Sequence, residues 1–377
     1  AIFAVAAVLA ISAVGAAART TRWHELEAKA YDHAQYVAEF GKAYASAEEH
    51  AMRKEVFEGR LARIMAHNRD TTKTWKEGVN HLTDRTDGEL KAMMGYKKAV
   101  GYTARGNGTF CPHMEAKRHE AFLASGAPTS LDWRMKENVI SPVKDQGQCG
   151  SCWTFATAAT VESWSAIKTG QLQELSEQQI ASCSPNPKDC GGTGGCEGGT
   201  AQVGFAGIQT AGGVASEWTY PYTSYMGTDS KCAATGIKKV VQLSGFKNVA
   251  TNSYADLMST LQDGPVAISV AAMSWSSYES GVYNGCNATS PDIDHAVQVV
   301  GYGTDATTGQ DYWIVRNSWS PSWGEDGYIR LLRQGANAKC GMDTRPMDGD
   351  GCKGGPTQVK VCGTCGILYD NAVPTIA

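Results

Sequence analysis

The segment that most constrains this chain is residues 146–156, which read QGQCGSCWTFA. It places Cys149 and Cys152 three positions apart, with glycines around the first cysteine and a helix-like run after the second. A thiol directly ahead of a helix lies near backbone N–H groups and the positive end of the helix dipole, which favour the nucleophilic thiolate. The segment therefore predicts a reactive thiolate at Cys152, and Gln146 can donate a side-chain N–H to a developing oxyanion.

Histidine is distributed very unevenly. Seven of the eight histidines lie at or before residue 119, so His295 is the candidate base for Cys152 in the part of the chain that follows. A nucleophilic cysteine needs such a group to take its proton and later to protonate the leaving group. In the later motif NSW, Asn317 offers an amide that can orient the imidazole, and Trp319 can shield that hydrogen bond from water.

Each of these residues also has a plain structural explanation. Cys152 could be half of a disulfide, His295 a packed core histidine and Asn317 a turn residue. Their order along the chain, with the local pattern around the cysteine, resembles that of papain-like cysteine proteases. The resemblance is to the papain and cathepsin L group and covers nearly the whole chain, with a mature part that runs from Asp132 to Pro374.

The resemblance implies the roles of the catalytic residues. The implied catalytic set is Cys152, His295, Asn317 and Gln146. The backbone N–H of Cys152 and the side chain of Gln146 would form the oxyanion hole, where one donor is typically worth ~3 kcal/mol. Trp319 would line the substrate site and cover the imidazole.

The resemblance also implies a substrate site. Gly198 and Gly199 would bind the substrate backbone as a short strand, although a disulfide-tethered loop explains these glycines too. The pocket for the second residue before the scissile bond would have small walls, formed by Thr200, Ala201, Ser269, Ile293 and Ala296. Asp370 would lie at its floor and pair with Arg or Lys of a substrate; the alternative is that Asp370 points into solvent.

The part before the mature enzyme resembles an inhibitory propeptide. Its helical signature is represented by Glu49, Arg53, Phe57, Arg60, Ile64 and Asn68, with Arg60 in place of the expected Asn. A second motif spans residues 78–84, GVNHLTD, in which Leu82 replaces the expected aromatic residue. We expect this replacement to loosen the docking of the segment.

The implied fold class is α+β. A mainly helical propeptide would precede a two-domain papain-like enzyme, with the active site in the cleft between a helical domain and an antiparallel, β-barrel-like domain. The expected boundaries are residues 1–18 for a signal peptide, 19–127 for the propeptide, 128–238 for the helical domain, and 239–377 for the β-rich domain, with an insertion at 341–364.

Local patterns agree with this division. Residues 22–70 predict two helices with a break near Gly41. A helix should follow Cys152 and run to about Lys168, where Gly170 stops it. Ser176 and Gln179 predict the capping box of another helix. From about residue 239, short apolar runs separated by turns predict strands.

Residues 1–18 are apolar and end in three alanines, which resembles a cleavable secretory signal that lacks its start. A membrane anchor is the alternative, but the stretch is barely long enough to span. A signal implies the secretory pathway, with a lysosome, a vacuole or the extracellular space as destination, and no stable membrane insertion. It also makes Asn107 and Asn287, each in an N-x-T triplet, candidate glycosylation sites.

The net charge of −4 hides a division between the two parts. Residues 19–127 hold 18 basic and 15 acidic residues, giving +3, and residues 128–377 hold 16 and 23, giving −7. A basic propeptide covering an acidic enzyme would be loosened by acid, although chance surface composition explains the division equally well. Nothing is basic or aromatic enough to indicate nucleic-acid binding.

Twelve cysteines behind a secretory signal predict disulfides. The resemblance implies the pairs Cys149–Cys196 and Cys183–Cys232, and pairs Cys286 with Cys365 or Cys340. Four cysteines near the end of the chain could in principle bind zinc, but their spacing favours disulfides: Cys340, Cys352, Cys362 and Cys365. Cys111 and Cys190 have no implied partner.

The sequence therefore predicts a cysteine endopeptidase made as a zymogen, acting on proteins and peptides, inhibited by its own propeptide, monomeric, and without metal or cofactor. A catalytically inactive inhibitor or binding protein on the same scaffold is the alternative. A thiol oxidoreductase using Cys149 and Cys152 is a third reading, disfavoured because the resemblance pairs Cys149 with Cys196.

Overall fold

The computed structural model describes residues 20–95, 126–186, 192–346 and 356–377. The predicted signal peptide and residues 96–125 of the predicted propeptide lie outside the described residues. So do Asn107, and the cysteines whose pairing the sequence left open at Cys111, Cys190 and Cys352.

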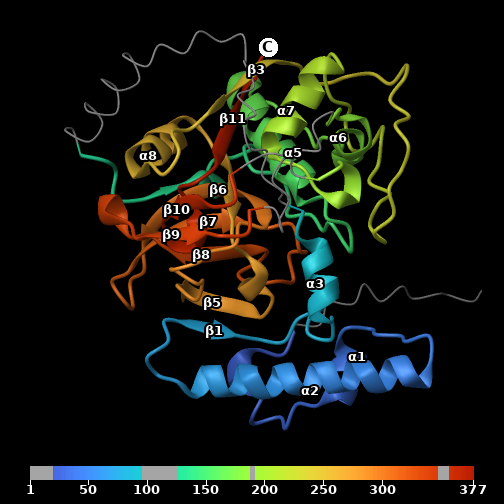
Figure 1. The fold of residues 1–377 in the computed structure, drawn as a ribbon, viewed down its shortest axis with the longest axis vertical. Helices are drawn as coiled ribbons and strands as arrows, with labels where there is room; N and C mark the ends of the chain where they lie inside the picture. Colours follow the sequence, from blue (N-terminus) through green and yellow to red (C-terminus); the bar gives the residue numbers. More distant parts are fainter. Residues whose placement is uncertain (1–19, 96–125, 187–191, 347–355) are drawn as a thin grey trace, which may run out of the picture.

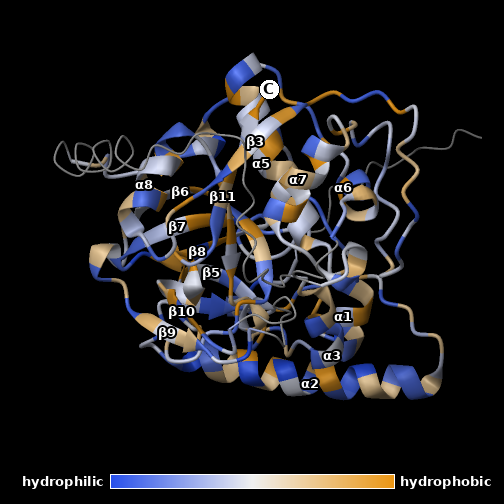
Figure 2. Cartoon of the chain, turned by 45° about the horizontal axis from the view of Figure 1, so that its top comes forward, coloured by the Kyte–Doolittle hydropathy of each residue, from blue (hydrophilic) through white to orange (hydrophobic). Residues whose placement is uncertain are grey.

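The segment predicted to be the propeptide forms a layer of its own on one side of the molecule (Figure 1). Its elements are α1 (His33–Glu39), α2 (Ala47–Arg69), β1 (Trp75–Glu77) and α3 (Asp87–Met93). The predicted break near Gly41 is confirmed, because α1 ends at Glu39 and Ser46 caps α2. Polar and apolar residues alternate along α2 (Figure 2), and its apolar face buries Phe57 and Ile64.

The helical half is built around α5 (Cys152–Thr169), which packs against α6 (Glu177–Cys183), α7 (Ala201–Thr210) and the sheet. As predicted, α5 stops at Gly170, whose φ of 74° is the left-handed conformation that glycine adopts easily. Ser176 caps α6 by accepting from the Gln179 N–H. The predicted capping box is wrong, because the Gln179 side chain instead donates to the Gly213 carbonyl and accepts from the Ala215 N–H.

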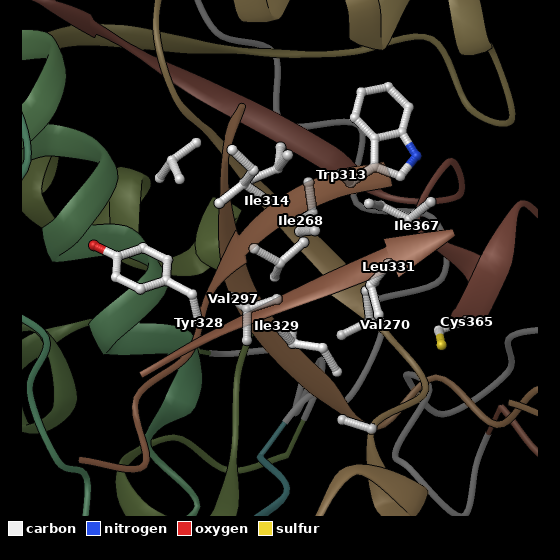
Figure 3. Close-up of a cluster of buried hydrophobic side chains, with 14 of the residues drawn as sticks. Ile268, Val270, Val297, Trp313, Ile314, Tyr328, Ile329, Leu331, Cys365 and Ile367 are labelled. Carbon is white, nitrogen blue, oxygen red and sulfur yellow. The ribbon is translucent and has the colours of Figure 1, made fainter. Parts of the chain in front are cut away.

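The other half is a sheet whose strands follow the order β1-β5-β8-β7-β6-β4-β11-β3, with β2 paired to β6. The strands after β1 are β2 (Leu131–Asp132), β3 (Leu243–Asn248), β4 (Val266–Val270), β5 (Tyr278–Tyr283), β6 (His295–Thr304), β7 (Asp311–Arg316), β8 (Tyr328–Leu332) and β11 (Asn371–Ile376). The pairs are antiparallel as predicted, except that β5 and β8 run parallel. Over the described residues the sheet is an open path from β1 to β3, and a cluster of buried side chains packs around its central strands (Figure 3).

Shorter elements complete the chain. The helix α8 (Tyr254–Asp263), which the sequence pattern did not predict, contacts β6. The 3-10 helices cover Trp23–Glu25, Trp133–Met135, Gly195–Glu197, Met273–Trp275, Gly335–Asn337 and Thr364–Gly366. At the predicted insertion, beginning one residue before its expected start, β9 (Cys340–Asp343) and β10 (Val359–Cys362) form a separate two-stranded antiparallel sheet.

Disulfides join the pairs that the resemblance implied: Cys149–Cys196, Cys183–Cys232 and Cys286–Cys365. Of the two partners left open for Cys286, the structure has Cys365. Cys340 bonds to Cys362 across the β9–β10 pair. Since these bonds use three of the four cysteines considered for zinc, the zinc alternative is wrong.

The propeptide joins the enzyme mainly through backbone and apolar contacts. Strand β1 pairs with β5, so the propeptide adds an edge strand to the sheet of the enzyme. Leu82 is 3% exposed and belongs to the large apolar cluster of the enzyme half. The pair Arg22–Glu279 crosses the boundary, whereas Arg53 pairs with carboxylates of the propeptide itself. Among the described residues, the contacts between the two parts are therefore chiefly backbone and apolar, with the Arg22–Glu279 ion pair beside them.

Candidate active site

Cys152 is the first residue of α5, and its side chain is fully buried. Among the residues that the structure describes, it is the cysteine that remains outside a disulfide. Its Sγ atom accepts from the backbone N–H of Ala296 at 3.4 Å, which brings the start of α5 against the start of β6. The helix that the sequence predicted and the strand that carries His295 therefore meet at this thiol.

His295 is the first residue of β6, and its ring is fully buried. Its Nε2 atom lies 2.8 Å from Asn317 Oδ1, while its Nδ1 atom has no hydrogen-bond partner among the described residues. The ring of Trp319 stacks on the imidazole at a centroid distance of 4.9 Å, and Trp275 meets it edge-on at 6.4 Å. One nitrogen is thus fixed by Asn317, and the other remains for proton transfer.

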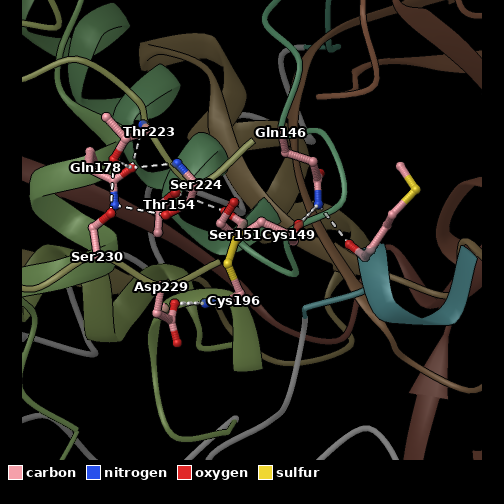
Figure 4. Close-up of a disulfide and its surroundings, with 12 residues drawn as sticks. Gln146, Cys149, Ser151, Thr154, Gln178, Cys196, Thr223, Ser224, Asp229 and Ser230 are labelled. Atoms are coloured by element: carbon pink, nitrogen blue, oxygen red, sulfur yellow. Dashed lines mark hydrogen bonds between the residues drawn. A yellow bond between two sulfur atoms is a disulfide. The ribbon is translucent and has the colours of Figure 1, made fainter. Parts of the chain in front are cut away.

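Gln146 is also fully buried, and both ends of its amide are held. Its Nε2 group donates to the carbonyls of Met93 at 2.7 Å and Cys149 at 2.8 Å, and Oε1 accepts from Ser318 Oγ at 2.6 Å. Figure 4 shows this amide next to the disulfide that joins Cys149 to Cys196. Sequence reasoning missed Ser318, although it lies inside the NSW motif.

The propeptide runs through the site directly after α3. Besides the bond from Gln146 to Met93, the N–H of Gly199 donates to the carbonyl of Gly95 at 3.0 Å. A Cβ atom on Gly95 would lie 1.6 Å from the carbonyl oxygen of Gly150, so only glycine fits this approach. Two groups expected to bind substrate, the Gln146 amide and the Gly199 N–H, are therefore occupied by propeptide carbonyls.

Burial shifts the pKa of both the thiol and the imidazole. Burial raises the pKa of Cys152 to about 12, against the opposing effect of the Ala296 N–H. Burial also lowers the pKa of His295 to about 4, against the opposing effect of the hydrogen bond to Asn317. Both shifts favour the neutral forms of the thiol and the imidazole over the reactive ion pair.

The residues expected to form the substrate pocket come from several elements. Thr200 caps α7, Ala201 begins it, and Ser269 lies on β4. Ala201, Ile293 and Ala296 share one buried apolar cluster. The structure thus brings the predicted walls to one region between the helical half and the sheet.

Asp370 lies against this region. Its Oδ2 atom accepts from Ser269 Oγ at 3.2 Å, and its Oδ1 atom accepts from Gln202 Nε2 at 2.9 Å. The side chain is half-buried, so the alternative of a carboxylate that simply points into solvent does not describe it. Sequence reasoning missed Gln202, whose only signal was its place two residues after Thr200.

Comparisons with known proteins agree with this geometry. The model of the papain family cysteine protease matches residues 127–349, and that of the cathepsin propeptide inhibitor domain (I29) matches residues 33–90. The chain is 42% identical to Cysteine protease 1 of Oryza sativa subsp. japonica over 78% of this chain and 58% of that protein. It is 35% identical to a cathepsin L-like proteinase of Phaedon cochleariae over 80% of this chain and 88% of that protein.

Solved structures give the same result. The recombinant stem bromelain precursor aligns with a TM-score of 0.71 and 30% identity over 91% of this chain and 97% of its own. Digestive procathepsin L2 from the Tenebrio molitor larval midgut also aligns with a TM-score of 0.71 and 30% identity. The alignment covers 91% of this chain and 98% of that one. The chain spans 58% and 62% of the lengths of two rice relatives, Cysteine protease 1 and Oryzain beta chain. The chain belongs to the papain family of cysteine proteases and carries a cathepsin propeptide inhibitor domain ahead of the protease domain.

Proposed function

We propose that the protein is the zymogen of a cysteine endopeptidase in which Cys152 is the nucleophile. The proposal rests on one observation. A buried thiol outside any disulfide, at the start of α5, lies against the start of β6, where Asn317 orients the imidazole of His295. A cysteine beside a histidine that a third group orients is the arrangement of nucleophilic acyl transfer.

The steps follow from the positions of these groups. His295 Nδ1 takes the thiol proton, and Sγ attacks the carbonyl carbon of the scissile bond. The negative charge moves to the carbonyl oxygen, where the Gln146 amide and the backbone N–H of Cys152 would stabilise it. His295 then returns the proton to the amide nitrogen, the amine leaves and a thioester remains. Water, deprotonated by the same imidazole, hydrolyses the thioester and restores the thiol.

The propeptide is proposed to inhibit this reaction by occupation of the site. Met93 and Gly95 present carbonyls to Gln146 and Gly199, the donors that a substrate would need. We propose the domain division of the sequence analysis, with residues 19–127 removed on activation and the mature enzyme starting near Pro128. The mature enzyme would act on proteins and peptides as a monomer, with no metal or cofactor required.

Selectivity is proposed to arise next to Asp370. A carboxylate held by Ser269 and Gln202 can accept hydrogen bonds from an Arg or Lys side chain at the second position before the scissile bond. The small walls leave room for such a residue.

We propose the secretory pathway as the route, with a lysosome, a vacuole or the extracellular space as destination. The predicted signal at residues 1–18 and the propeptide domain support this route. Within the ranges that the structure describes, no helix combines the length and the apolar character that a membrane span requires.

The test is hydrolysis of dipeptidyl fluorogenic substrates by acid-treated precursor, with Arg, Leu or Phe at the second position before the bond. Cys152→Ala should abolish turnover, and Asp370→Ala should remove a preference for Arg while turnover of Leu persists. Asp326→Asn, at an exposed turn where φ is 55°, is the control for loss of a carboxylate, because asparagine tolerates this left-handed conformation. Absence of turnover from processed, disulfide-intact protein would refute the enzyme and favour the inactive binding protein.

A further inference from the structure

The hairpin formed by β9 and β10 lies outside the proposed catalytic set. Cys340 and Cys362 are opposite each other in its register and joined by a disulfide, and Asp343 lies opposite Val359. The side chain of Asn252 also holds the hairpin, because its Nδ2 group donates to the Lys360 carbonyl and its Oδ1 atom accepts from the Cys362 N–H. The hairpin stem is therefore fixed to the body of the enzyme.

The stem packs tightly against the loop that leads to His295. The N–H of Met342 donates to the carbonyl of Thr289 at 2.9 Å. A Cβ atom on Gly341 would lie 2.4 Å from the carbonyl oxygen of Ala288 and 2.6 Å from Pro291 Cδ. Because no side chain fits between them, the two backbones lie in direct contact.

Asp343 is the residue that ties the end of β9 to this loop. Its side chain is 3% exposed, and each carboxylate oxygen accepts a backbone N–H. Oδ2 accepts from Ile293 at 3.2 Å, and Oδ1 accepts from Arg345 at 3.0 Å. The guanidinium of Arg345 lies 3.3 Å from the carboxylate of Asp292, which adds a more exposed contact at the same point.

The loop residue that Asp343 holds is a predicted wall of the substrate pocket. Ile293 is 4% exposed and belongs to the apolar cluster of Ala201, Ala296 and Tyr369. It also covers Gly366, where a Cβ atom would lie 2.4 Å from Ile293 Cδ1. The position of the Ile293 side chain in the pocket thus depends on where its backbone is held.

We propose that Asp343 is a positioning residue for substrate selection, which holds the Ile293 wall and so decides which side chains the pocket accepts. The inference rests on the proposed function. His295 is fixed separately, by Asn317 and Trp319, so loss of Asp343 should alter selection and leave thiol reactivity intact. An amide cannot replace the carboxylate, because its NH2 group would face one of the two N–H donors.

The first experiment measures selectivity. Mature Asp343→Asn and wild-type enzymes are compared on fluorogenic substrates with Leu, Val or Ala at the second position before the bond. The Leu-to-Ala ratio of kcat/KM should fall by about 10-fold in Asp343→Asn, through KM. One methylene in a hydrophobic pocket is worth roughly 10- to 200-fold, and the Ile293 wall is displaced and not removed. The rate of alkylation by iodoacetamide should not change, and Lys360→Ala, exposed on the same hairpin, should match wild type.

The second experiment needs no activity. Hydrogen exchange of the precursor should show faster exchange of the Ile293 amide in Asp343→Asn and no change in Lys360→Ala. Unchanged exchange, an unchanged ratio, or a parallel fall in alkylation rate would each overturn the inference. If wild type does not hydrolyse peptides but exchange still rises, the proposed function fails while the positioning contact stands. If Asp343→Asn does not fold, Arg345→Ala is used, because it removes the contact to Asp292. It should lower the Leu-to-Ala ratio of kcat/KM by a smaller factor than expected for Asp343→Asn. An unchanged ratio overturns the inference.

Discussion

The Nε2 atom of His295 lies 2.8 Å from the Oδ1 atom of Asn317, and both side chains are buried. The Asn317 oxygen also accepts from the Ser318 N–H, which fixes the amide. The contact therefore specifies that Nε2 carries the hydrogen, and it leaves Nδ1 for the thiol.

Asn317→Ala should lower kcat/KM by about 10- to 100-fold, because loss of a buried partner costs ~1–3 kcal/mol. The hydrogen bond to Asn317 raises the pKa of His295, so its removal lowers that pKa. The alkaline limb of the kcat/KM profile, where the imidazolium loses its proton, should move to lower pH. Ser322→Ala, exposed in the same loop, should leave both the rate and the profile unchanged.

Gln146→Glu should lower kcat by about 100- to 1,000-fold with little change in KM, the usual result of removing one oxyanion donor. Glutamate keeps the acceptor for Ser318 Oγ but would turn an oxygen towards the Cys149 carbonyl, so Gln146→Ala is measured beside it and should show a loss of similar size. Steady-state kinetics of the processed enzyme measure the effect. Gln148→Ala, two residues on, is the control, and a loss of equal size there would contradict the assignment.

The sequence was sufficient to predict those structural features that depend on residues close together in the chain. The end of α5 at Gly170 and the cap at Ser176 depend on neighbouring residues. The catalytic residues were predicted from the order of the cysteine, histidine and asparagine along the chain. Gln179 shows where local rules fail, because its amide bonds to a strand-like segment more than thirty residues away instead of capping its own helix.

Contacts between distant segments could not be predicted from the sequence. The hydrogen bonds of Asp370 depend on the pairing of β11 with β4, which sets its carboxylate beside Ser269. In the β9–β10 hairpin, only Val359 to Cys362 has a strand-like alternation, and β9 has none, so the pairing is known from the register and the disulfide. Asp343 was missed for the same reason.

Release of the propeptide should be favoured by acid through His81. Burial lowers the pKa of this histidine to about 4 from 6.5, and the charges nearby are those of Asp145 on the enzyme and Lys42, Arg85 and Asp84 on the propeptide. Because the docked pKa is depressed, the stabilisation is complete above pH 6.5 and is lost as the pH falls through 6.5 towards 4.

His81→Gln should therefore require a lower pH for conversion of the precursor. The extent of processing is measured on gels after incubation across pH 4–7, with Cys152 alkylation as a second readout. His24→Gln, exposed on the propeptide, is the control and should leave the curve in place. A curve for His81→Gln that overlies wild type would exclude this histidine as the acid-sensitive group.

Leu82 tests how firmly the propeptide is attached. The sequence led us to expect loose docking here, because leucine replaces an aromatic residue, yet Leu82 is 3% exposed within an apolar cluster that includes Trp75, Leu90 and Tyr283. Leu82→Ala should weaken docking by ~2–5 kcal/mol, the usual cost of truncating a buried leucine. The precursor should then release its propeptide at a lower urea concentration at neutral pH.

The release is followed by the appearance of a reactive Cys152 thiol as urea is raised. Met52→Ala, at a partly exposed position on α2, is the control for truncation of a large apolar side chain and should release at the wild-type concentration. Leu82→Phe separates the remaining alternatives. Tighter attachment in Leu82→Phe would mean that leucine leaves unfilled space, as the sequence suggested. Looser attachment would mean that the cluster is already filled, since overpacking costs ~1–3 kcal/mol.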